Sequence, residues 1–118
     1  MNNPLADQGK IFDLKSLHDQ QSLRQRVLVD SGKVQVTHFI IPANEEIPTH
    51  EAHGEIVIHC LTGRVVVAAL KESRELRSDH LLCLNVGEPF SIRAIQDAAI
   101  LATIVLPKEG EAVELIGN

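Results

Sequence analysis

Aromatic residues are scarce in this sequence. Tryptophan and tyrosine are absent from its 118 residues, and only Phe12, Phe39 and Phe90 carry a benzene ring. A hydrophobic core with so few rings has to be built from valine, isoleucine, leucine and alanine, and branched aliphatic side chains favour strands. A chain of this length supports one core rather than two. We therefore expect a single domain made mainly of β-strands.

Concentrated positive charge is also missing. The formal net charge is -5, and even the closely spaced Arg24 and Arg26 are separated by a glutamine. Nucleic-acid binding needs a clustered basic face, so nucleic acid is not an expected partner. The apolar runs are too short to cross a membrane, and the first ten residues do not resemble a secretory signal. We expect a cytoplasmic protein with no membrane partner.

Cysteine is nearly absent as well. Cys60 and Cys83 each lie inside an apolar run and do not form a CxxC pair, which favours buried free thiols over a disulfide. Neither cysteine has a basic neighbour in sequence that would activate it, and no glycine-rich phosphate loop is present. The sequence therefore gives no support to thiol catalysis or nucleotide binding.

Short apolar segments separated by turn residues make up most of the chain. Residues 1–20 contain few apolar side chains and are predicted to form an N-terminal arm with a short strand or a helical turn, while residues 21–118 form one β domain. The predicted strands are 25–30, 34–41, 55–61, 64–70, 80–86, 89–95 and 98–106. Residues 42–54 are predicted as a loop, and residues 71–79 as a charged connection able to pair as an exposed hairpin. Short strands at even spacing indicate an all-β sandwich or closed barrel.

Two predicted strands, 64–70 and 98–106, are apolar at successive positions rather than at alternate ones. Both of their faces should therefore be covered, since a long exposed apolar edge promotes aggregation. One face can line the inside of a barrel, and the other can meet a second sheet or another subunit. On this basis we predict a homodimer.

The segment IPTHEAHGEIVIHC, residues 47–60, concentrates histidine and carboxylate side chains. Glu55 and His59 lie on the same face of a regular strand. If that face points inward, His50, His53 and His59 form a cluster suited to Zn, Ni, Cu or Fe. Glu55 is then a further ligand or an acid-base group, and His38 on the preceding strand can reach the same cavity.

The opposite phase of this strand is equally compatible with the sequence. In that case Ile56, Ile58 and Cys60 point inward, and His59 points to the outer side of the sheet or to a dimer contact. A bulge near Gly54 would shift the phase by one residue. The sequence alone leaves both arrangements open.

Residues 34 to 107 resemble the small single-domain cupins of the RmlC-like superfamily. In the first cupin motif His50 takes the place of the first histidine, Gly63 that of the closing glycine, and Asn44 that of the initial glycine. Asparagine tolerates the left-handed backbone that a turn at Asn44 needs. However, Ala52 and Ile56 stand where the family has its second histidine and its glutamate.

The second cupin motif matches the family at fewer positions than the first. Gly87 matches its glycine, while Asp79, Asn85 and Ala94 replace the first glycine, the proline and the asparagine, and Phe90 stands in place of the last metal-binding histidine. The resemblance implies a double-stranded β-helix, or jelly-roll barrel, that usually dimerises and often holds a divalent metal. Only one of the four usual ligands is in place, so the resemblance implies a degenerate metal site.

Phe90 and Arg93 are the candidate residues of a ligand pocket. Phe90 can fill the space left by a missing ligand, or it can form an aromatic wall for a small apolar or planar molecule. Arg93 alternates with Ser91 and Ile95, so it either contacts an anion inside the pocket or forms a salt bridge on the outer surface.

Three functions are compatible with these features. We expect a small-molecule-binding protein with an unassigned reaction and, as an open question, a divalent transition metal at a non-standard site. The alternatives are a metal-dependent enzyme of the dioxygenase, isomerase or decarboxylase type with a rearranged histidine site, and a structural or sensing module. Whether the protein is an enzyme is not decided by the sequence.

Overall fold

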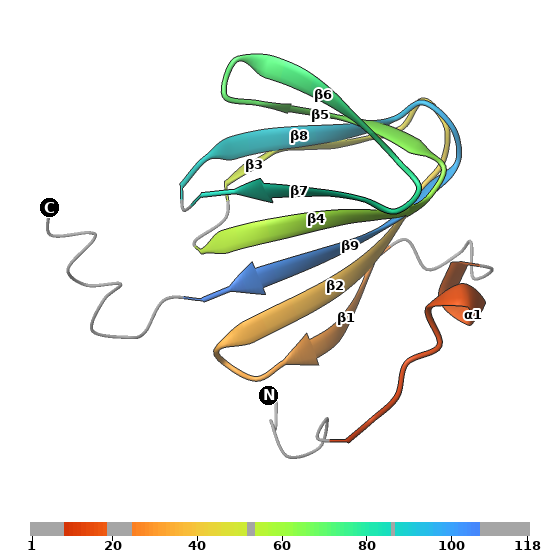
Figure 1. Ribbon diagram of the computed structural model, residues 1–118, viewed down its shortest axis with the longest axis vertical. Coiled ribbons are helices and arrows are strands. Elements are labelled where there is room, and N and C mark those ends of the chain that lie inside the picture. The colour runs from red at the N-terminus through yellow and green to blue at the C-terminus, as the bar shows by residue number, and fades with distance from the viewer. Residues whose placement is uncertain (1–8, 19–24, 52–53, 86, 107–118) are drawn as a thin grey trace, which may run out of the picture.

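The computed structural model describes residues 9–18, 25–51, 54–85 and 87–106, and the observations below concern these residues (Figure 1). They form one short helix and nine strands. The elements are α1 (Leu14–His18), β1 (Gln25–Asp30), β2 (Val34–Ile41), β3 (Glu46–Glu51), β4 (Glu55–Thr62), β5 (Arg64–Ala69), β6 (Glu72–Arg77), β7 (His80–Leu84), β8 (Pro89–Ala94) and β9 (Ala98–Val105). The helical turn expected near the N-terminus is present as α1.

Two antiparallel sheets face each other. One has the strand order β1-β2-β9-β4-β7 and the other the order β3-β8-β5-β6. The last strand, β9, lies between β2 and β4 and pairs with both, so strands far apart in sequence meet in the middle of the first sheet (Figure 1). This crossed arrangement of two antiparallel sheets confirms the predicted all-β jelly-roll barrel.

Two strands were not expected. β3 lies within the predicted loop 42–54, and β6 lies within the charged connection 71–79. β6 pairs with β5 across a tight turn at Leu70 and Lys71, where φ is +57° and +64°. The predicted hairpin within 71–79 is therefore wrong, because β6 pairs with β5 and the turn between them is made by Leu70 and Lys71. Both strands are rich in charged residues, which is common where a strand lies at a sheet edge.

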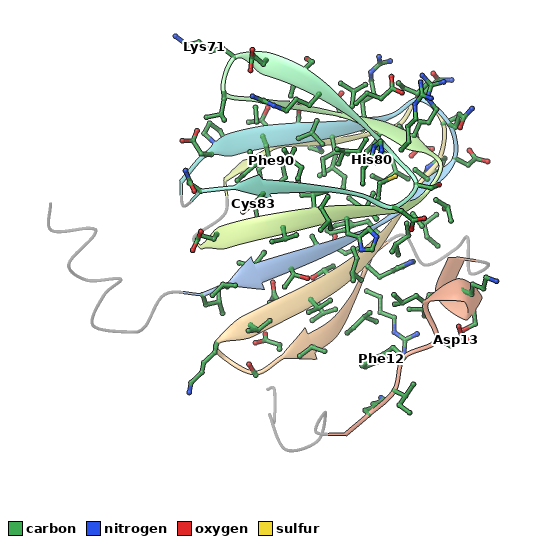
Figure 2. The ribbon with its side chains drawn as sticks, viewed as in Figure 1. Phe12, Asp13, Lys71, His80, Cys83 and Phe90 are labelled. Atoms are coloured by element: carbon green, nitrogen blue, oxygen red, sulfur yellow. The ribbon has the colours of Figure 1, made fainter. Side chains whose placement is uncertain are left out.

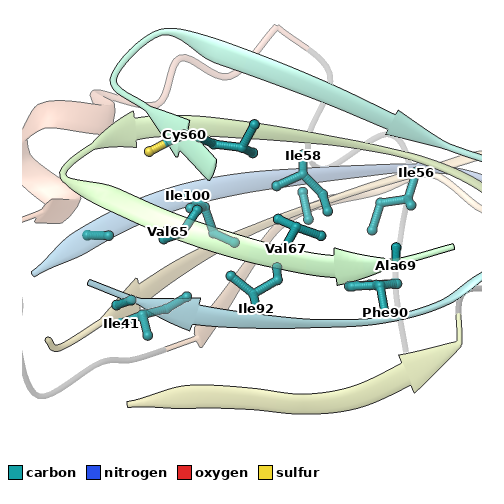
Figure 3. Packing of buried hydrophobic residues seen from close by; sticks show 14 of the residues in the cluster. Ile41, Ile56, Ile58, Cys60, Val65, Val67, Ala69, Phe90, Ile92 and Ile100 are labelled. Carbon is teal, nitrogen blue, oxygen red and sulfur yellow. The ribbon is translucent and has the colours of Figure 1, made fainter. Parts of the chain in front are cut away.

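The core fills the space between the sheets. Along β4 the side chains of Ile56, Ile58 and Cys60 are buried, while their neighbours are more exposed. Figure 3 shows these three side chains and Val65 and Val67 of β5 in the buried cluster between the strands. The strand therefore adopts the phase in which the even-numbered residues from 56 to 60 face inward.

Two turns depend on left-handed backbone. Asn44 has φ +69°, as expected for the position that a glycine occupies in the cupin motif. Gly63, with φ +82°, closes the turn between β4 and β5. A β-carbon at Gly63 would clash with the backbone of Asp97 and Ala98, so this turn needs glycine for both its conformation and its close contact.

Within the described residues, no helix has the length and apolar character that a transmembrane segment needs.

Candidate functional site

A cavity of about 270 Å³ lies between the two sheets, near β1, β2 and β3. Its walls come from both sheets. The lining residues are Gln25, Gln35, Thr37, Phe39, Ile47, Ile56, Phe90, Ile92, Ala102 and Ile104. Most of these side chains are apolar, and among the described residues of the lining none carries a formal charge. The cavity thus offers a mainly apolar space to a small molecule.

One wall of the cavity is polar. Gln35, Thr37 and Phe39 alternate along β2 and face inward, and Gln25 lies opposite Phe39 on β1. Register places Gln35 beside Ile104 and Thr37 beside Ala102 on β9, which also line the cavity. Among the described residues of the lining, the polar side chains all come from the β1–β2 hairpin.

Phe90 lies on the opposite wall. It is 4% exposed, belongs to the hydrophobic core and lines the cavity, and its position on β8 is marked in Figure 2. The two roles predicted for it, an apolar filler and an aromatic wall, are both compatible with this position. In the β3–β8 register Phe90 pairs with His50, so the backbone of His50 lies next to the cavity wall.

His59 and Glu55 do not face this cavity. Because Ile56, Ile58 and Cys60 point inward, His59 lies on the outer side of the five-stranded sheet, where it is partly exposed, and Glu55 is exposed. The interpretation that places both side chains inside the barrel is therefore wrong, since β4 has the other phase.

His38 is buried at 2% exposure but also belongs to the outer side of the sheet. It pairs with Leu101 on β9, which pairs in turn with His59 on β4, so these three residues form one row across the sheet. Its neighbours Thr37 and Phe39 are the β2 residues that line the cavity. The predicted approach of His38 to the cavity is thus wrong.

The other two histidines of the predicted metal cluster are His50 and His53. His53 is outside the described residues, and so is the side chain of His50. Among the residues that are described, no group of three or more histidine, cysteine, aspartate or glutamate side chains is close enough to hold a metal ion.

Arg93 is exposed and does not line the cavity. On β8 it alternates with the buried Ile92 and Ala94, and its partner across β3 is Glu46, which is also exposed. Arg93 was predicted to lie either inside the pocket or on the outer surface. The structure places it on the outer side of the four-stranded sheet.

The two cysteines occupy opposite environments. Both are free, as predicted, but Cys60 is buried whereas Cys83 is exposed on β7. The prediction of burial is wrong for Cys83, because β7 is an edge strand and Cys83 pairs with Val57 on the outer side of the sheet. Burial raises the pKa of the Cys60 thiol, and the nearby charge of Asp79 raises it further.

The polar wall was missed in the sequence. Its signal was the alternation of Gln35, Thr37, Phe39 and Ile41 along one strand, which places two polar groups on the same face as two apolar ones. Polar side chains on an inward face are informative, since a buried polar group needs a hydrogen-bond partner.

Comparison with known proteins gives structural matches only. No family model matches the sequence, and no curated protein matches it significantly. The fold is similar to that of a cupin superfamily protein from Desulfitobacterium hafniense, with a TM-score of 0.74 and 19% identity over 85% of this chain and 94% of that one.

Two further structures are similar over most of the chain. A cupin-2 domain containing protein from Shewanella frigidimarina has a TM-score of 0.64 and 16% identity, covering 87% of this chain and 99% of that one. A predicted oxalate decarboxylase from Thermotoga maritima has a TM-score of 0.65 and 20% identity, covering 70% of this chain and 79% of that one. Together with the two-sheet topology, these matches show that the chain has the fold of a small cupin domain.

Proposed function

We propose that this protein binds a small molecule in the cavity between its two sheets. The observation that carries the proposal is the cavity itself, about 270 Å³ in volume and lined from both sheets by mainly apolar side chains. At about 30 Å³ for a water-sized atom, it suits a ligand of roughly ten non-hydrogen atoms. Phe90 contributes an aromatic surface against which a planar group can pack.

A cavity-filling variant tests this proposal. Ala102 lines the cavity and is 5% exposed, so the larger side chain of Ala102→Leu would occupy part of its volume. We expect uncharged fragments to shift the amide resonances of Thr37, Ala102 and Ile104 in the wild-type protein and to lose this effect in the variant. Ala68→Leu, at an exposed position of β5, is the matched control. If no fragment shifts cavity resonances in the wild-type protein, the proposal is wrong.

We also propose that the functional unit is a homodimer joined through the outer side of the five-stranded sheet. On that side Leu101 of β9, Val57 of β4 and Leu81 of β7 are apolar, and Leu81 on the edge strand is 64% exposed. Val105, at the end of β9, is 49% exposed. A second copy of the chain would remove this surface from water, which is the main driving force for association of such faces.

A metal-dependent cupin enzyme is the second candidate. The β3–β8 register favours it, because it brings the backbone of His50 next to Phe90 at the cavity wall. The described residues do not by themselves form a metal site, since Glu55, His59 and His38 belong to the outer side. Only His50 and His53 remain as ligands, fewer than the three protein ligands that catalytic zinc sites typically have.

Elemental analysis of protein purified without chelator or a histidine tag tests this candidate. Bound metal should disappear in His50→Ala and His53→Ala and remain in His59→Ala, whose side chain lies outside the barrel. Less than about a tenth of an equivalent of any transition metal, also after reconstitution, would rule out the enzyme in this form.

A further inference from the structure

The cavity has a polar wall whose groups are all neutral. Among the described residues, Gln25, Gln35 and Thr37 are the polar members of the lining, and none of the described lining residues is an aspartate, glutamate, lysine, arginine or histidine. An ion moved into such a space would lose its hydration without gaining an opposite charge, which is costly. The cavity should therefore discriminate between ligands of the same shape by their charge.

The hydroxyl of Thr37 is the most buried of these groups. Thr37 is 4% exposed, and its hydroxyl has no hydrogen-bond partner among the described residues. Every fully buried side-chain nitrogen or oxygen in this part of the chain does have a partner. The Thr37 hydroxyl is consequently accessible from the cavity that the residue lines. It can donate a hydrogen bond to a ligand or accept one.

Gln35 is held by a contact outside the cavity. Its Nε2 donates a hydrogen bond to the Asp30 carboxylate at 3.3 Å, and the other oxygen of Asp30 accepts a bond from the backbone N–H of Gly32 at 3.1 Å. This contact uses one of the two hydrogens on Nε2 and directs the nitrogen of the Gln35 amide toward Asp30. Its carbonyl oxygen, Oε1, is then the group available as an acceptor for a ligand.

The surroundings of the cavity carry negative charge. A neighbouring depression of about 220 Å³ shares Gln25, Phe39 and Ile47 with the cavity and is also lined by Glu45 and Glu46. Asp30 lies opposite Gln35 in the β1–β2 register and accepts its hydrogen bond. Anionic ligands are thus opposed both by the neutral lining and by these carboxylates.

From this arrangement we infer that the ligand is an uncharged, mainly apolar molecule with one amide or hydroxyl group. That group accepts a hydrogen bond from the Thr37 hydroxyl and donates one to Gln35 Oε1, while the apolar part packs against Ile92, Phe90 and Ile104. This inference rests on the proposed function, because it assigns the ligand class of the same cavity. It adds that recognition uses the neutral hydrogen-bonding groups of Thr37 and Gln35.

Four probes of similar size test the inference on the full-length protein by amide chemical-shift titration. Benzamide has the neutral donor and acceptor, benzoate is its anionic counterpart, acetophenone keeps only the acceptor, and toluene has neither. We expect benzamide to bind about tenfold more tightly than benzoate or toluene, with acetophenone between them. One hydrogen bond between neutral groups contributes about 0.5–1.5 kcal/mol, or roughly a two- to tenfold change in affinity.

Two variants separate the contributions of the polar groups. Thr37→Val should weaken both benzamide and acetophenone by about three- to tenfold and leave toluene unchanged. Gln35→Met should weaken benzamide alone, so that benzamide and acetophenone bind equally. Thr103→Val is the matched control, because Thr103 lies next to Ala102 on β9 but on the outer side of the sheet. Melting temperatures of the three variants establish that each is folded.

The outcomes distinguish this inference from the function on which it rests. Tight benzoate binding, or equal affinity for benzamide and toluene at cavity resonances, would overturn the neutral-ligand inference and leave small-molecule binding standing. An unchanged benzamide affinity in folded Thr37→Val protein would also overturn it. If none of the four probes shifts a cavity resonance, the proposed function fails together with the inference.

Discussion

The two sheets of this barrel have very different outer sides. The outer side of the five-stranded sheet carries apolar residues next to histidines, with the row His38, Leu101, His59 and Leu81 across four strands, in which His38 is buried and Leu81 is 64% exposed. The outer side of the four-stranded sheet is charged, and its members include Arg64, Glu75, Arg77, Arg93 and Glu46. A charged face is stable in water, whereas an apolar face of this extent is typical of an interface. The comparison supports the proposal that only the five-stranded sheet has a partner.

Substitutions on the inner side of the barrel should cost more folding stability than substitutions on the outer side. Ile58 is fully buried, and its neighbour His59 lies on the outer side of the same strand. We expect Ile58→Ala to lower the free energy of unfolding by roughly 2–5 kcal/mol, because it removes buried methyl groups and leaves a cavity. His59→Ala should cost much less. Chemical denaturation of the two variants measures this difference, and equal losses would contradict the observed phase of β4.

The rates at which Cys60 and Cys83 are alkylated compare the solvent access of the inner and outer sides of the barrel. Cys83 is exposed and Cys60 is buried with a raised pKa, so we expect iodoacetamide at pH 8 to modify Cys83 faster by on the order of a hundredfold. Mass spectrometry of a Cys83→Ser variant should show nearly no early labelling, and a Cys60→Ser variant should react like the wild-type protein. If a dimer covers Cys83, the labelling of this thiol will slow as protein concentration rises.

Charge placed on each outer side tests which of them is an interface. Leu81→Asp should weaken dimerisation by about tenfold or more, because it puts a carboxylate into an apolar contact. Arg93→Ala changes the net charge by the same amount on the four-stranded sheet and should leave the association unchanged. Light scattering over a concentration series gives both results. A wild-type protein that stays monomeric at micromolar concentration would refute the homodimer.

The smallest effect is expected in the charged cluster of the four-stranded sheet. Glu75 accepts hydrogen bonds from Arg64 at 3.0 and 3.1 Å and from Arg77 at 2.8 Å. These contacts lower the pKa of the Glu75 carboxyl from 4.5 to about 2. The group is well exposed, so its effect on stability should be small in salt.

The pH dependence of this cluster follows from the lowered pKa. The Glu75 contribution is fully present above about pH 4.5 and should be lost as the pH falls toward 2, because the unfolded chain takes up the proton first. Denaturation of wild-type and Glu75→Gln protein at pH 7 and pH 3 measures this loss. A difference between the two proteins that grows on acidification would contradict the assignment.

Much of the fold could be predicted from residue patterns. The alternation and turn residues gave seven of the strands because a strand with one buried face repeats its side-chain pattern every two residues. β3 and β6 were missed for the same reason, since their charged residues carry no such apolar repeat. Asn44 could be assigned to a left-handed turn because few residues other than glycine tolerate that conformation.

The candidate site was harder to predict. The density of histidines near His50 and His53 predicted a metal site, yet His59 and His38 belong to the outer side of the sheet. Gln35 and Thr37, which line the cavity, have ordinary sequence surroundings. Which side of a strand faces the interior depends on its pairing, and one residue of shift reverses every side chain.

The sequence by itself determined that this protein has an all-β fold with few aromatic rings and that Gly63 and Asn44 make turns. These properties follow from local backbone preferences and from the short-range pattern of apolar residues. Only the tertiary structure decided that His59 lies outside the barrel, that Cys83 is exposed, and that Thr37 and Gln35 meet Phe90 around one cavity. Those features depend on pairing between strands distant in the chain, such as β2 with β9, and no local pattern encodes the register of such a pair.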